Sequence, residues 1–170
     1  MSTVASPVRD PAWPLDRTAV GLWTAHGVLR SLGVAPLAVV ALLAVPGDAP
    51  APVSVLRWLV PLLVGLYAAA QIGVEPWIRF RVHRWEVTDD AVYTLTGWLN
   101  RTWTLVPIAR IQTVDVTRGP LQLLFGLASV AVLTASSHGT VRIPHLAAEV
   151  ARRVADDLAR RAETVRDEAT

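Results

Sequence analysis

Two apolar runs without a charged residue restrict the folds that this chain can adopt. They extend over residues 31–47 and 58–74, and each contains 17 residues. A helix of this length rises about 25 Å at about 1.5 Å per residue, slightly less than the hydrocarbon core of a bilayer. We therefore expect a transmembrane hairpin, with spans over about residues 28–46 and about residues 55–75. The alternative is a buried hairpin in a soluble domain, but a chain of 170 residues offers little protein to cover two helices that are apolar on all sides.

The residues around the two runs predict the orientation of the hairpin. Basic residues lie on its outer flanks: Arg9, Arg17 and Arg30 before the first run, and Arg79, Arg81 and Arg84 after the second. The connecting turn, residues 46–52, offers only Asp48, although Arg57 lies at the start of the second span. Because cytoplasmic flanks of membrane helices are enriched in arginine, we expect a multi-pass protein of the cell (inner) membrane with both termini in the cytoplasm. Residues 17–30 predict a helix in the membrane interface, and residues 1–16, with three prolines, predict a disordered tail.

Small residues recur at every fourth position in and beside the two runs: Gly27, Ser31 and Ala35 in the first, and Gly65, Ala69 and Gly73 in the second. This spacing lets two helices approach closely in lipid. A general richness in Ala and Gly explains the pattern equally well, so both interpretations stay open at this point.

The second half of the chain has the two-residue period of β-strands. Apolar and polar residues alternate over residues 81–105 and predict a meander of three strands, and a fourth strand follows over residues 111–117. Residues 129–135 are apolar on both faces and predict a central strand, and a turn over residues 136–139 leads to a last strand. Pro144 is expected to open an amphipathic helix whose apolar stripe packs on the sheet. The stripe consists of Ala147, Val150, Ala151, Val154, Leu158 and Ala162.

Three segments of this β-rich half resemble a known family. RWEVTDDAVYTLTGWL, VPIARIQTVDVTRGPLQLLFGLASVAVLTA and VRIPHL are similar to the bacterial pleckstrin-homology (PH)-like membrane proteins of the YdbS-like family. The resemblance covers about residues 79–161, and its most specific part is the run RIQ-x-VDV-x-x-GPLQ-x-LFG. It implies a membrane hairpin followed by a PH-like barrel, and it implies no enzyme chemistry.

Composition and motifs argue against catalysis and against nucleic acid as a partner. The chain has no Cys, which excludes a thiolate metal site, and its net charge of +2 comes without a long basic run. None of the four histidines has a metal-ligand spacing to another His or to a carboxylate. The carboxylates of Asp89 and Asp90 are adjacent on a predicted turn and point apart. We therefore expect no catalytic residue, no metal and no cofactor.

The connection between the fourth and the central strand is the candidate binding surface. Long polar side chains lie on and beside the fourth strand: Arg110, Gln112, Asp115 and Arg118. Arginine can hold carboxylates or phosphates, so a lipid headgroup or an acidic partner segment is one interpretation, and a solvated strand face with an internal Asp–Arg pair is the other. The apolar group that follows, Leu121, Leu123, Leu124 and Phe125, either plugs one end of the barrel or is exposed for docking.

Together these features predict an α+β membrane protein. A disordered tail (residues 1–16) precedes an interfacial segment with a two-helix transmembrane hairpin (17–78), a PH-like curved β-sheet or barrel capped by a C-terminal amphipathic helix (79–165) and a short tail (166–170). We expect a non-enzymatic scaffold or assembly module at the cytoplasmic membrane face. Its partners would be the lipid bilayer and a membrane protein, either a related PH-like protein or a second copy. A sensor of anionic lipid headgroups is the alternative function, and a membrane enzyme is less favoured.

Overall fold

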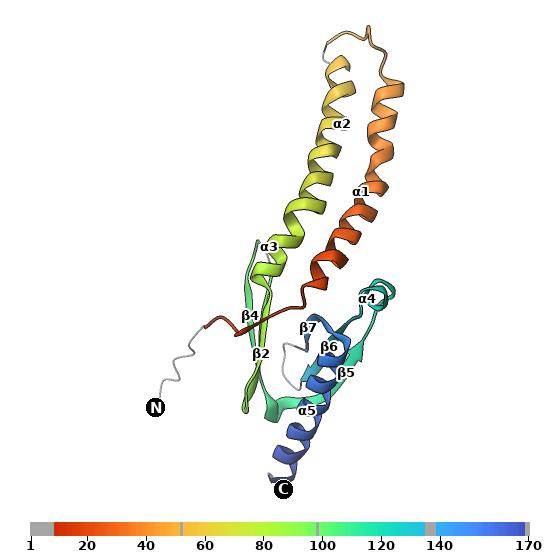
Figure 1. Cartoon of the computed structure of the whole chain (residues 1–170). Helices are drawn as coiled ribbons and strands as arrows, with labels where there is room; N and C mark the ends of the chain where they lie inside the picture. Colours follow the sequence, from red (N-terminus) through yellow and green to blue (C-terminus); the bar gives the residue numbers. More distant parts are fainter. Residues whose placement is uncertain (1–8, 52, 98, 135–138, 169–170) are drawn as a thin grey trace, which may run out of the picture. The chain divides into compact units, whose positions relative to one another are not determined.

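A computed structural model describes residues 9–51, 53–97, 99–134 and 139–168. The chain forms two compact units (Figure 1). Residues 20–78 make a helical unit, and the N-terminal segment up to residue 19 joins residues 79–170 in a β unit. The predicted turn over residues 136–139 lies outside the described residues except for Gly139.

The helical unit is built from two long helices. Its elements are α1 (Thr18–Ala44), α2 (Val53–Ala69), the π-helical turn η1 (Ala70–Val74) and α3 (Glu75–Val82), the last three following one another without a break. Thr18–Ala44 and Val53–Val82 are both long and apolar enough to cross a membrane, judged by length and composition. The predicted interfacial helix is not a separate element, because these residues form the first half of α1.

The two helices approach closely at Gly27. A Cβ atom at this position would overlap the backbone carbonyl of Gln71 in the π-helical turn, so a larger residue does not fit without movement. Beside it, Arg30 donates a hydrogen bond from Nη1 to Oε1 of Gln71 at 3.1 Å. An added Cβ at Gly65 or Gly73 would meet nothing within 4 Å. Packing within the hairpin therefore accounts for Gly27 but not for the glycines of the second helix.

Arg57, the basic residue that disagrees with the predicted orientation, has a local structural role. Its Nη1 donates a hydrogen bond to the carbonyl oxygen of Val45 at 3.0 Å, and its guanidinium lies over the ring of Trp58. Val45 directly follows α1, where backbone carbonyls lack helical partners and a positive charge is favourable. The cation at this end of the hairpin thus caps a helix.

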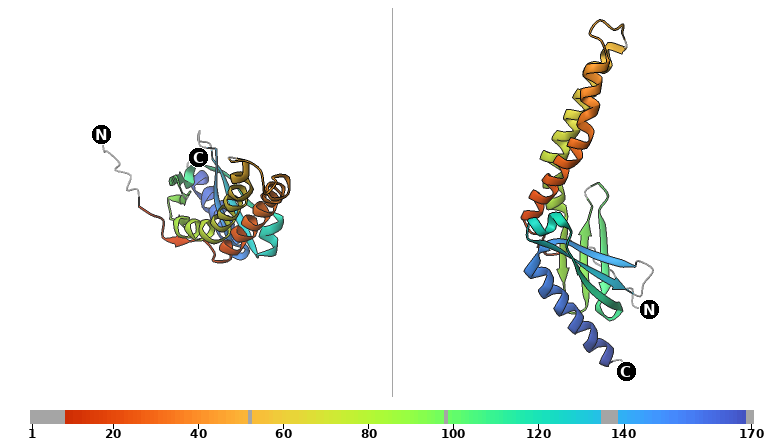
Figure 2. Two further views of the ribbon diagram at one scale, coloured as in Figure 1. Left: turned by 90° about the horizontal axis from the view of Figure 1, so that it is seen from above. Right: turned by 90° about the vertical axis from the view of Figure 1, so that its right-hand side faces the viewer.

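Two antiparallel sheets form the β unit (Figure 2). The first has the order β1 (Trp13–Pro14), β2 (Arg84–Val87), β3 (Ala91–Thr96) and β4 (Thr102–Pro107). The second has the order β5 (Ile111–Thr117), β6 (Leu127–Thr134) and β7 (Thr140–Ala147). The short helices η2 (Ile108–Arg110) and α4 (Pro120–Leu124) flank β5. The predicted meander, the fourth strand and the central position of the strand near residue 130 are confirmed.

The C-terminal helix α5 (Ala148–Glu168) packs on η2 and on all three strands of the second sheet. Four residues of its stripe face are buried: Ala151, Ala155, Leu158 and Ala162. This arrangement confirms the predicted α+β fold, with a curved sheet capped by a C-terminal amphipathic helix. The helix continues through residue 168, so the prediction of a tail from residue 166 onward is wrong for its described part.

The N-terminal segment is not a disordered tail in its described part, residues 9–16. Its strand β1 pairs with β2, the backbone N–H of Ala12 donates to Glu86 Oε2 at 3.0 Å, and Leu15 is buried. The same carboxylate group accepts from Arg9 at 2.7 Å. The open edge of β2 accepts a proline-containing strand because an edge position needs fewer backbone donors. Sequence periodicity does not reveal so short a strand.

The C-terminal helix begins at Ala148 and not at Pro144, where it was predicted. Pro144 lies inside β7, which is an edge strand of the second sheet. Proline has no N–H for a ladder hydrogen bond and is tolerated at sheet edges and bulges. The helix was predicted to begin too early because Pro144 belongs to an irregular part of β7.

Candidate functional site

A β-bulge between β6 and β7 shapes the candidate site. The register of the two strands shifts between Ala128 and Val130, so that Ser129 alone lies opposite both Pro144 and His145. His145 has a φ of 52°, a left-handed conformation that few residues other than glycine adopt. Its backbone N–H donates to Ser129 Oγ at 3.4 Å. Bulges of this kind redirect side chains next to functional sites, and this one brings the imidazole of His145 to the residues of α4.

Gln122 ties α4 to the bulge. Its Nε2 donates to Ser129 Oγ at 2.8 Å and lies 3.0 Å from Nδ1 of His145, while its Oε1 accepts from the backbone N–H of Gly119 at 3.0 Å. Because an amide nitrogen only donates, Nδ1 of His145 is the acceptor in this pair. Gln122 is the one polar residue in the stretch PLQLLF. A single side chain therefore holds a short apolar helix against the sheet.

The same hydrogen bonds decide which leucines are exposed. Leu123 and Leu124 are 56% and 80% exposed, whereas Leu121 and Phe125 are only partly exposed. Residues 121, 122 and 125 share one face of a helical turn, so inward placement of Gln122 turns the two intervening leucines outward. Leu127 is fully buried at the start of β6. The interpretation as a barrel plug is therefore wrong for Leu123 and Leu124.

The predicted polar residues do not form one patch. Arg110 and Gln112 are exposed at the beginning of β5, and Arg118 follows the end of that strand. At about 3.3 Å per residue, the eight residue steps from Arg110 to Arg118 span about 26 Å. Arg118 is exposed and donates from Nε to the carbonyl oxygen of Leu127 at 3.0 Å. Of the three, Arg118 is thus the one beside α4.

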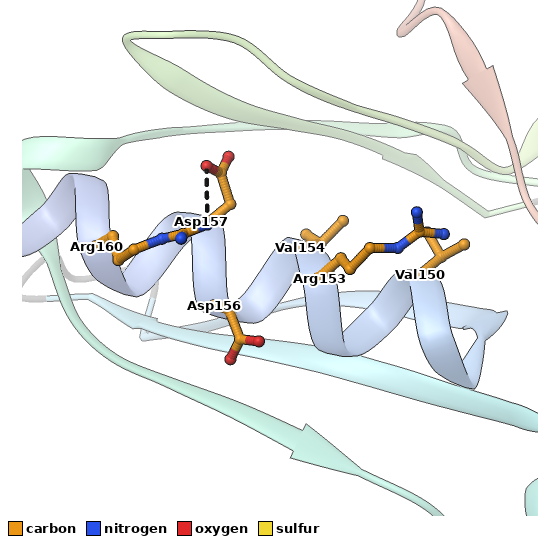
Figure 3. Close-up of a pocket in the computed structure, with 6 residues that line it drawn as sticks. All are labelled: Val150, Arg153, Val154, Asp156, Asp157 and Arg160. Carbon is orange, nitrogen blue, oxygen red and sulfur yellow. Dashed lines mark ion pairs between the residues drawn. The ribbon is translucent and has the colours of Figure 1, made fainter.

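Other concave surfaces offer less chemistry. A shallow depression of about 510 Å³ runs along α5 (Figure 3). It is lined by Val150, Arg153, Val154, Asp156, Asp157 and Arg160. Two arginines and two aspartates balance in charge, and Asp157 pairs with Arg160 at 3.9 Å, so an ionic ligand finds no net opposite charge here. Within the described residues, no group of three or more His, Cys, Asp or Glu side chains could hold a metal ion.

Sequence reasoning missed the roles of Ser129 and His145. It placed His145 at the start of a helix and counted Ser129 only as the first residue of an apolar strand. Two signals pointed to the network: a lone Gln122 in an apolar segment, and Pro144 inside a strand pattern, which suggests an edge or a bulge. Neither signal names the hydrogen-bond partner, because the partner depends on strand register.

Comparison with known proteins identifies a family model and a curated relative that match this chain. A family model of the bacterial PH domain matches residues 27–162. The UPF0699 transmembrane protein YdbS of Bacillus subtilis (strain 168) is 32% identical to this chain over 111 residues. The aligned region spans 65% of this chain and 65% of the length of that curated relative. No solved structure matches the chain significantly.

Proposed function

This chain belongs to the bacterial PH domain family, and we propose that it is a non-enzymatic assembly module that a transmembrane hairpin holds at the cytoplasmic face of the cell membrane. It is a membrane-associated protein with two helices long and apolar enough to cross a bilayer, and it is similar to a relative named a transmembrane protein. The partner we propose is a second membrane protein, either a related PH-like protein or another copy of this chain.

The observation that carries this proposal is the fixed exposure of Leu123 and Leu124. Full burial of one leucine side chain contributes about 1.5–3 kcal/mol, so two leucines at 56% and 80% exposure leave much of this gain for a partner. Gln122 holds the backbone of α4 in place, which lowers the entropy lost when a partner binds. A rigid apolar pair beside an exposed Arg118 suits a docking surface better than a reaction centre.

Photo-crosslinking in native membranes tests the contact. A photoreactive amino acid at Leu124 should form an adduct with a membrane protein, whereas the same group at Val165 on α5, which is 36% exposed, should not. Adducts of Leu124 with lipid alone would contradict the assembly function.

A variant pair then tests the affinity of the contact. Leu123→Ser with Leu124→Ser should abolish co-purification of the crosslinked partner with the tagged full-length protein in mild detergent. The matched control is Val116→Ser with Leu133→Ser, which removes two apolar side chains of 38% and 40% exposure from the second sheet. Equal loss in both double variants would mean that α4 is not the docking surface.

The orientation of the hairpin is tested separately. The arginines on its outer flanks support cytoplasmic termini, since this membrane face attracts basic flanks. A topology reporter fused to the C-terminus should report the cytoplasm, and one inserted at Asp48 should report the opposite side. A C-terminus outside the cytoplasm would move the β unit to the other face and end the proposal in this form.

A second candidate function is recognition of anionic headgroups, which the exposed guanidinium of Arg118 beside the apolar leucines favours. Binding of the purified protein in detergent to anionic lipid would then weaken with salt and with Arg118→Gln, because screened charges attract less. Insensitivity to both changes would exclude this function for Arg118.

A further inference from the structure

We propose that the connection between β3 and β4, at Gly97 and residues 99–101, rests on the anionic headgroup layer of the membrane that the hairpin spans. The proposal concerns a surface other than α4 and a different occupant, the bilayer itself. It rests on the proposed function in one respect, namely that the long helices cross the membrane.

The first observation is where this connection is held. His83 directly follows α3, and its Nε2 accepts a hydrogen bond from the backbone N–H of Gly97 at 3.5 Å. The other ring nitrogen, Nδ1, lies 2.8 Å from the carbonyl oxygen of Arg79 in the last turn of that helix. One side chain therefore joins the last turn of α3 to the first residue after β3, and both groups belong to the same unit of the structure.

The second observation is that the turn is tight and points an apolar side chain outward. Gly97 has a φ of +96°, and a Cβ atom there would overlap the carbonyl oxygen of Asn100. This geometry requires glycine at residue 97. Leu99 is 78% exposed, next to Leu124 the most exposed large apolar side chain of the described β unit. An exposed leucine at this position gains free energy when it enters a less aqueous layer.

The third observation is the sign of the local charge. Exposed or partly exposed arginines lie at this end of the β unit: Arg81, Arg84 and Arg101. Residues 76–85 and 91–114 contain no Asp or Glu. Two carboxylates lie nearby: Asp10 accepts a hydrogen bond from Trp103 Nε1 at 3.2 Å, and Glu86 pairs with Arg9 at 2.7 Å, so the three arginines leave a positive balance. Juxtamembrane arginines are attracted to anionic headgroups. The local positive charge therefore favours a bilayer with anionic lipids over an uncharged one.

Chain length shows that Leu99 can reach the headgroups. Trp77, an aromatic residue at the expected membrane interface, lies six residues before His83, which corresponds to about 9 Å of helix. The headgroup layer extends about 5–8 Å beyond the hydrocarbon core. Leu99 is two residues from Gly97, so it can lie up to about 7 Å from the point held by His83. This distance is enough to extend from His83 back to the headgroup layer. The turn therefore lies within reach of the interface.

Spin labelling of the full-length protein tests this contact, and the absence of Cys from the chain makes single labels unambiguous. A nitroxide is attached at Leu99→Cys and, as a matched control, at Asp89→Cys. Asp89 has a 97% exposed side chain on the turn at the opposite end of β3. Both proteins are reconstituted in vesicles of phosphatidylcholine with phosphatidylglycerol, and collisions of the label with oxygen and with a water-soluble nickel chelate are measured.

We expect the ratio of oxygen to nickel collisions to be higher at residue 99 than at residue 89, and to fall toward the control value in pure phosphatidylcholine or with Arg101→Gln. Equal ratios at the two positions in vesicles containing phosphatidylglycerol would overturn the inference, and so would a residue-99 label shielded from both reagents, which would indicate a protein partner. Extraction of the wild-type protein by alkaline carbonate would instead overturn the membrane span of the proposed function. If the protein stays in the membrane during this extraction but the label at residue 99 is exposed to water, only the lipid contact is refuted and the membrane span stands.

Discussion

Gln122→Met should destabilise the β unit although it keeps the length and approximate volume of the side chain. The substitution removes three hydrogen bonds, to Gly119 at 3.0 Å, to Ser129 at 2.8 Å and to His145 at 3.0 Å. Each such bond contributes about 0.5–1.5 kcal/mol, so for a partly buried group we expect a loss of about 2 kcal/mol in the free energy of unfolding. For a unit of this size that loss lowers the melting temperature by about 8–16 °C.

The assay is thermal and denaturant unfolding of the full-length protein in mild detergent, followed by tryptophan fluorescence. Gln112→Met is the matched control, because Gln112 is exposed on β5 and its loss should change stability by less than about 0.5 kcal/mol. Ser129→Ala, alone and combined with Gln122→Met, completes a double-mutant cycle in which the two changes should cost less together than in sum. Equal melting temperatures for the Gln122 and Gln112 variants would refute the anchoring role of Gln122.

Three further outcomes can be checked on the same protein. Leu158→Asp should unfold the β unit, because a carboxylate would enter a fully buried position at a cost of several kcal/mol, while Arg153→Ala on the exposed face should leave protease resistance unchanged. Gly27→Ala should loosen the helical hairpin, seen as faster hydrogen exchange near Gln71, whereas Gly65→Ala, with open space around it, should not. Burial lowers the pKa of His83 below its ordinary 6.5 and outweighs the hydrogen bond to the Arg79 carbonyl, which raises it. The unfolded chain therefore binds a proton at this residue at a higher pH than the folded protein does, so the free energy of unfolding falls as the pH drops below about 6.5. His83→Gln should flatten that part of the plot of stability against pH.

Local pattern predicted most of the elements. The apolar runs became the two long helices, and the alternating segments became strands at nearly the expected positions, because burial of one face imposes a period that the sequence displays. The stripe of α5 was visible for the same reason, and Leu158 and Ala151 are buried as expected. These features depend on neighbours within one element, which is the range that a sequence pattern reports.

The features that pattern could not supply depend on register between distant segments. The strand at Trp13 exists because β2 presents an open edge, and the bulge at His145 exists because Ser129 alone faces two residues of β7. The orientation of Leu123 and Leu124 follows in turn from the hydrogen bonds that this bulge offers to Gln122. Arg110 and Arg118 of the predicted polar surface lie at opposite ends of β5, since residues along one strand are spread over its length.

The two proposed surfaces restrict the kind of partner that can bind. Within the β unit, α4 and the β3–β4 connection lie at the same end, away from the C-terminal end of α5 (Figures 1 and 2). If Leu99 rests on headgroups, then Leu123 and Leu124 are presented close to the bilayer, where a freely soluble protein has limited access. A partner that reaches α4 in this position would itself be embedded in, or attached to, the same membrane. Two-dimensional confinement would raise its effective concentration, so a modest contact area on α4 could suffice for assembly.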